Sequence, residues 1–272
     1  MDKLTKILNW LKPKLERIGT EIDFSFKKTV IIFAALIIVS GAVRWIRVAE
    51  VRLLERDEIV YIEAVERWLD GGFAAVYSDE EMTVPPLLLF LTQSASRTGL
   101  DVITSGKLVA VTAGVLFIIP FFFIGRLLWR NSNGAGLLLM TLAATHPYAI
   151  RMAALIERDG IYVMLLAYFF WGIIYAEIRG GAWGWGASGL TLALMVLNRQ
   201  ESLELLAVMP LYLILQVCCD RGLWRGALWR LLFFLGGFAA MLIFASLVMG
   251  IPAGYWRNHF RKFVVFFEHR NI

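Results

Sequence analysis

Long apolar runs alternate with short charged connectors, and this alternation constrains the fold more than any other feature of the chain. Of the 272 residues 59% are hydrophobic, with a mean hydropathy of +0.67, whereas soluble domains are about 45–50% apolar. The runs cover residues 29–46, 103–128, 134–148, 160–178, 183–197, 203–217 and 231–249. Spanning a bilayer core takes about 20 apolar residues. The pattern predicts an all-α integral membrane protein with about seven transmembrane helices.

The basic residues lie where membrane topology explains them. Arginines follow the second, fourth and sixth runs, and the N-terminal segment carries Lys3, Lys6, Lys12, Lys14, Arg17, Lys27 and Lys28. Because cytoplasmic connectors carry an excess of Lys and Arg, we expect a cytoplasmic N-terminus and an outside location for the acidic loop 47–102. The net charge of +5 therefore does not indicate a nucleic-acid partner.

Three parts follow from this pattern. Residues 1–28 are expected to be a cytoplasmic segment, which is too charged for a cleavable signal peptide. Residues 29–250 form the transmembrane module, and residues 251–272 mix aromatic with basic side chains, as interfacial segments do. Residues 85–95 are apolar but too short to span, so we expect an interfacial or re-entrant helix. A bacterial or archaeal cell membrane is the expected location.

The first charged segment, "DEIVYIEAVERWLDGGF", follows the first apolar run. Ile62, Val65 and Leu69 recur at helical spacing, which predicts an amphipathic helix on the outer surface that ends at the glycine pair 71–72. Asp57 and Glu58 stand at its start. Locally, Asp57 reads as an N-cap and Glu58 as a first-turn acid. The alternative is a carboxylate that accepts a proton in a reaction.

Two further charged segments connect later runs, namely "HPYAIRMAALIERDGIY" at 146–162 and "NRQESLELL" at 198–206. Their connectors are so short that the charges lie close to membrane depth, where ionisable groups are usually paired or functional. The simpler interpretation is interfacial charge, with Asp159 as a helix cap. In the seven-span arrangement all three segments converge at the outer face. Carboxylates that take a proton, beside arginines that hold a phosphate, suit a reaction on a phosphate-bearing lipid.

These segments, in this order, resemble the GT-C-type glycosyltransferases, and most closely glycosyltransferase family thirty-nine, which includes protein O-mannosyltransferases and the aminoarabinose transferases of lipid A. The first segment resembles the D-E-x-x-Y helix of that family, and "VPPLLLFLT" resembles the short helix that follows. The other two resemble the family's Arg-Asp segment and its basic connector. The resemblance covers about residues 29–250 and implies a GT-C-type bundle; family members are usually longer, with further spans.

The resemblance implies inverting transfer of a sugar from a polyprenyl-phosphate donor to a protein, lipid or glycan acceptor on the outer face. Asp57 would be the catalytic carboxylate, with Glu58 beside it. Asp159 would be the second acidic residue, which in some relatives joins the first around a divalent metal (Mg²⁺ or Mn²⁺). Arg199 falls where a basic residue contacts the lipid phosphate. The remaining candidates are Arg151 and Arg158 for the phosphate, and Glu201 and His146 as other active-site residues.

Two other classes of function stay open. One is a non-catalytic subunit that binds the lipid carrier or acts as a scaffold, and it would show carrier binding without sugar transfer. The other is a small transporter, which is disfavoured because transporters tend to place polar groups near the bilayer midplane in repeated halves.

The orientation can be tested by cysteine labelling in a chain whose Cys218 and Cys219 are replaced by serine. In intact cells, Ser78→Cys is expected to react with a membrane-impermeant maleimide, because the loop 47–102 lies outside in this arrangement. Asn131→Cys is expected to react only after permeabilisation. The reverse pattern would place the carboxylates in the cytoplasm and contradict the functional interpretation.

Overall fold

The computed structural model describes residues 24–51, 54–77, 84–252 and 254–256, and within these ranges the chain is helical with no β-strand. The helices are α2 (Phe26–Glu50), α3 (Arg56–Tyr77), α4 (Pro86–Ser96), α5 (Val102–Leu128), α6 (Asn133–Ala144), α7 (Pro147–Met152), α8 (Arg158–Arg179), α9 (Ala182–Asn198), α10 (Leu203–Cys219) and α11 (Trp224–Met249), with 3₁₀ turns η1 (Gln200–Ser202) and η2 (Arg221–Leu223).

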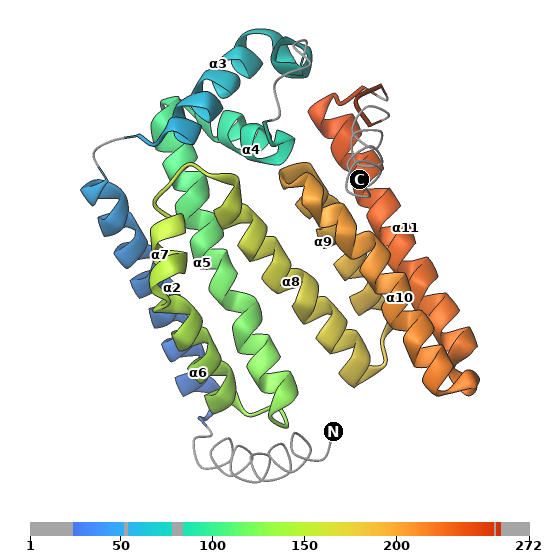
Figure 1. The fold of residues 1–272 in the computed structure, drawn as a ribbon. Coiled ribbons are helices and arrows are strands. Elements are labelled where there is room, and N and C mark those ends of the chain that lie inside the picture. The colour runs from blue at the N-terminus through green and yellow to red at the C-terminus, as the bar shows by residue number, and fades with distance from the viewer. Residues whose placement is uncertain (1–23, 52–53, 78–83, 253, 257–272) are drawn as a thin grey trace, which may run out of the picture.

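The chain reverses direction at each step from α2 through α5, α6, α8, α9 and α10 to α11 (Figure 1). Helices α3 and α4 lie across one end of this bundle, which we call the α3 end. The expected short helix near residues 85–95 is confirmed as α4. Five helices of the described part are long and apolar enough to cross a membrane. They are α2, α5, α8, α10 together with the preceding turn η1, and α11.

The expected spans at 134–148 and 183–197 do not reach that length. Helix α6 has 12 residues and is therefore about 18 Å long, against a bilayer core of about 30 Å. The run that was expected to form one helix is broken at His146, whose backbone is extended (ψ 117°) because Pro147 follows it and begins α7. A residue before proline is disfavoured in the helical region. Helix α9, with 17 residues, is also short.

A buried arginine joins α2 to the broken end of α6. The Arg44 side chain is fully buried, and its Nη1 donates to the Ser40 carbonyl at 3.2 Å, to the Ser40 hydroxyl and to the Ala144 carbonyl at 3.4 Å. Ala144 is the last residue of α6, where backbone carbonyls lack helical partners. A cation at this position satisfies one carbonyl and complements the negative end of the helix dipole. Arg44 therefore supplies a donor to a helix end inside the bundle, while its Nε and Nη2 atoms find no hydrogen-bond partner among the described residues.

Small residues bring α9 close to α8 on one side and to α11 on the other. A Cβ atom at Gly184 would lie 2.7 Å from Cβ of Ala176 on α8, and one at Gly237 of α11 would clash with the Gly186 carbonyl. The Ser188 hydroxyl donates to the Phe169 carbonyl of α8 at 3.0 Å. Small residues and interhelical hydrogen bonds are the usual means of helix association in membranes. The short helix α9 is thereby enclosed by α8 and α11.

Gly237→Ala is expected to destabilise the protein by about 1–3 kcal/mol, the usual cost of overpacking a close contact. The control is Gly236→Ala, one residue earlier, where an added Cβ meets no atom within 4 Å. Alanine is the better helix former by about 0.5–1 kcal/mol, so this control should be neutral or slightly stabilising. Thermal unfolding in detergent, followed by tryptophan fluorescence, measures both. Equal melting temperatures for the two variants would contradict the close packing of α9 on α11.

Candidate functional site

Helix α3 presents a face different from the expected one. Val65 is buried as predicted, but Leu69 is 39% exposed, and the buried stripe consists of Glu58, Tyr61, Ala64, Val65 and Trp68. The large aromatic side chains, which bury the most apolar area, decide the orientation. The predicted end of the helix is confirmed as a break: Gly72 has a φ of 71°, and a second short helical stretch follows it to Tyr77.

Asp57 and Glu58 point to different environments. Asp57 is exposed and Glu58 is fully buried. The expectation that Asp57 is the N-cap is wrong, because α3 begins at Arg56 and the cap position falls to Glu55. Glu58, three residues later, accepts a hydrogen bond from the Glu55 backbone N–H at 2.8 Å, which is one half of a capping box. The two neighbouring carboxylates therefore lie in different environments.

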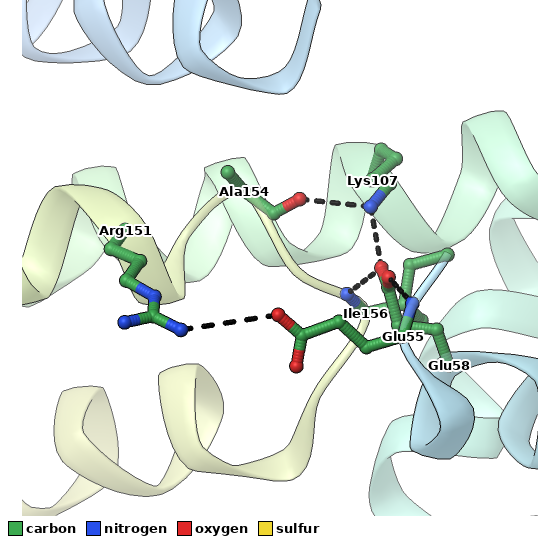
Figure 2. Close-up of polar contacts among 6 residues, drawn as sticks. All are labelled: Glu55, Glu58, Lys107, Arg151, Ala154 and Ile156. Carbon is green, nitrogen blue, oxygen red and sulfur yellow. Dashed lines mark hydrogen bonds and ion pairs between the residues drawn. The ribbon is translucent and has the colours of Figure 1, made fainter. Parts of the chain in front are cut away.

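The Glu58 carboxylate ties α3 to two other parts of the α3 end (Figure 2). Its Oε1 atom lies 2.5 Å from the Lys107 Nζ of α5 and accepts a hydrogen bond from the Ile156 backbone N–H at 2.8 Å. Lys107 also donates to the Ala154 carbonyl at 2.9 Å. The side chains of this ion pair are 0% and 8% exposed. One buried pair thus fixes α3, α5 and the segment 154–156 together.

Arg199 and Asp159, both predicted site residues, are brought together by the structure. Arg199 Nη1 lies 2.9 Å from Asp159 Oδ1, across the ends of α9 and α8. On the same guanidinium, Nε lies 3.5 Å from Glu201 Oε2, and the group stacks over the Tyr162 ring with its carbon 5.3 Å from the centroid. Asp159 stands in the first turn of α8 and does not cap it, since the helix begins at Arg158 after the N-cap residue Glu157.

The charge of Asp57 acts on the same neighbouring groups as the charge of Asp159. Burial raises the pKa of the Tyr61 hydroxyl, the Arg158 guanidinium lowers it in part, and the carboxylates of Asp57, Glu157 and Asp159 raise it further. Burial also raises the pKa of the Glu157 carboxyl, and the surrounding carboxylates add to this effect, Asp57 and Asp159 among them. Asp57 and Asp159 therefore act on the same two groups. The charged segments 57–73 and 146–162 therefore meet here, and the Asp159–Arg199 ion pair connects the segment 198–206 to them.

The other predicted site residues are less closely involved. Arg151 lies 4.0 Å from Glu55 in an exposed ion pair, and the Arg158 side chain makes no ion pair with a described carboxylate. His146 is exposed, and its side chain forms no hydrogen bond or ion pair within the described ranges. Among the residues that the structure describes, no three His, Cys, Asp or Glu side chains gather as metal ligands would.

Three residues at this end were not among the predicted site residues. Lys107 is the only charged residue of α5 before Arg126, and an isolated cation in an apolar run is a signal that it needs a buried partner. Tyr61 belongs to the D-E-x-x-Y pattern, one helical turn after Asp57. Glu157 precedes the Arg-Asp pair but carries no signal of its own.

No protein-family model matches this chain, and no curated protein matches it significantly. The resemblance to the GT-C glycosyltransferases stays a prediction.

Glu58→Gln is expected to destabilise the protein by about 3–5 kcal/mol, because it leaves the buried Lys107 without a counter-charge. The matched control is Asp57→Asn, which removes the same charge one residue away from an exposed position and should change stability by less than about 0.5 kcal/mol. Combining Glu58→Gln with Lys107→Met should cost less than the two single changes added together. Thermal unfolding in detergent gives all four values; additive effects would mean that the two side chains are not coupled.

Proposed function

We propose that this chain is a membrane glycosyltransferase of the GT-C type, with seven spans and a cytoplasmic N-terminus. It would move a sugar from a polyprenyl-phosphate donor to an acceptor on the outer face. The observation that carries this proposal is the grouping at the α3 end, where the charges of the exposed Asp57 and of Asp159 both raise the pKa of Tyr61 and Glu157, and Asp159 lies 2.9 Å from Arg199. A proton acceptor and a phosphate-binding cation are the two groups that such a transfer needs.

Asp57 is the proposed general base. The acceptor oxygen attacks the anomeric carbon of the sugar while its proton passes to the Asp57 carboxylate. The bond between the anomeric carbon and the phosphate oxygen breaks, and its electron pair leaves with the polyprenyl phosphate. Attack opposite to the departing phosphate inverts the configuration at that carbon. Arg199 holds the phosphate and stabilises its growing negative charge.

Burial separates the two acidic candidates. Both oxygens of Glu58 already accept hydrogen bonds from Lys107 and from backbone N–H groups, so Glu58 is proposed as a positioning residue. Asp57 accepts no hydrogen bond from any described residue. Asp57 and Asp159 would be the residues that hold a Mg²⁺ or Mn²⁺ ion, which prefers carboxylate oxygens as ligands.

Asp57→Asn is expected to reduce sugar transfer by about 10²–10⁴-fold, the usual contribution of general base catalysis, with folding and carrier binding retained. Transfer would be measured in proteoliposomes with polyprenyl-phosphate mannose as the first donor of a panel. The control is Glu63→Gln on the exposed side of α3, which should transfer at the wild-type rate.

Two results would change the assignment. An Asp57→Asn protein that transfers at the wild-type rate would exclude Asp57 as the base; Glu157, whose pKa is raised, would then be tested as Glu157→Gln. A wild-type protein that binds the carrier but transfers no sugar from any donor would favour the non-catalytic carrier-binding alternative.

A further inference from the structure

The guanidinium of Arg199 is already engaged by anions of its own chain. Its Nη1 lies 2.9 Å from Asp159 Oδ1 and its Nε lies 3.5 Å from Glu201 Oε2. A guanidinium offers two edges for paired hydrogen bonds, one formed by Nη1 and Nη2 and the other by Nε and Nη2. Each edge therefore has one nitrogen that faces a carboxylate. A phosphate that approaches either edge of Arg199 therefore meets one of these two carboxylates.

We propose that Asp159 is an internal anion that competes with the donor phosphate for Arg199, so that phosphate binding exchanges one ion pair for another and releases the Asp159 carboxylate. This inference rests on the proposed role of Arg199 in holding the donor phosphate. We call the Asp159–Arg199 ion pair the latch. In the ligand-free protein Asp159 pairs with the Arg199 guanidinium, and the donor phosphate displaces it.

Replacing the Asp159–Arg199 ion pair with a phosphate–Arg199 ion pair costs little free energy. The Asp159 and Arg199 side chains are 35% and 33% exposed, and pairs with that degree of solvent access contribute little. The released carboxylate stays in the first turn of α8, where the helix dipole stabilises a negative charge.

The connection between α8 and α9 does not depend on the latch. Asn198 donates from Nδ2 to the Arg158 carbonyl at 2.6 Å, and its side chain is buried. This bond holds the end of α9 against the start of α8 whether or not Asp159 is paired. Opening the latch is therefore a change of side-chain partners that leaves the two helices in place.

The two competing carboxylates are not equivalent. Glu201 is more exposed than Asp159, at 57%, and its oxygen lies 0.6 Å farther from the nearest guanidinium nitrogen, at 3.5 Å against 2.9 Å. Asp159 should therefore be the stronger competitor. Glu204 is exposed and makes no ion pair with a described residue. Its charge acts on Tyr162, the ring over which the Arg199 guanidinium lies. It serves as the control for a general loss of negative charge.

The experiment measures binding of farnesyl phosphate to the full chain in detergent, with farnesol as the probe that lacks the phosphate. Asp159→Asn is expected to tighten farnesyl phosphate binding by about two- to five-fold and to leave farnesol binding unchanged. Glu201→Gln should tighten it less, and Glu204→Gln least. Arg199→Ala should weaken it by about ten- to a hundred-fold, and in that background Asp159→Asn should no longer tighten it.

The outcomes separate the latch from the function on which it rests. If Arg199→Ala weakens binding but Asp159→Asn also weakens it, Asp159 orients the arginine and the latch is wrong, while the donor site stands. If Asp159→Asn tightens binding equally with and without Arg199, the effect is general electrostatics and the latch is again wrong. If Arg199→Ala binds farnesyl phosphate as well as the wild-type protein, the proposed donor site is overturned together with the latch.

Discussion

The buried ion pair between Glu58 and Lys107 is the interaction on which the α3 end depends. Its two charges come from segments 49 residues apart in the chain, and each would be costly to bury alone. Together with the hydrogen bonds to Ala154 and Ile156, the pair makes α3 rest in one orientation on α5. Because consecutive residues of a helix are about 100° apart, fixing Glu58 inward also turns Asp57 toward solvent. A structural contact thereby decides where the candidate base stands.

Much of this arrangement could be predicted from the sequence, and the errors have definite causes. The apolar runs located the bundle helices, and the charged connectors indicated one end where Asp159 and Arg199 meet. The orientation of α3 was predicted from Ile62, Val65 and Leu69, whereas Tyr61 and Trp68 bury more area and turn the helix, so Glu58 lies inside. The break at His146 follows from Pro147. The apolar residues around this proline suggested one continuous helix. The Glu58–Lys107 pair is a tertiary contact, and no local pattern specifies its partner.

Helices α6 and α9, which are shorter than a helix that crosses a bilayer, are held by contacts with their neighbours. Helix α9 is enclosed by close contacts at Gly184, Gly186 and Gly189, so its backbone is shielded by protein on two sides. Helix α6 stops within the bundle, and Arg44 from α2 supplies a donor to its last carbonyl. Backbone ends at membrane depth are tolerated only where protein or water satisfies them. Among the described residues, the buried charges of Arg44, Glu58 and Lys107 serve a helix end and an ion pair.

A carboxylate can accept a proton in a reaction only if the donor hydroxyl can reach one of its oxygens. Glu58 fails this requirement, because it is fully buried and Lys107, Ile156 and Glu55 already donate to its two oxygens. Asp159 meets it in part, since its side chain is 35% exposed and only Oδ1 faces the Arg199 guanidinium, at 2.9 Å. Asp57 meets it throughout the described structure. The adjacent pair of acids at the start of α3 thus divides into one buried carboxylate whose hydrogen bonds join α3 to α5 and one exposed carboxylate that accepts no hydrogen bond from a described residue.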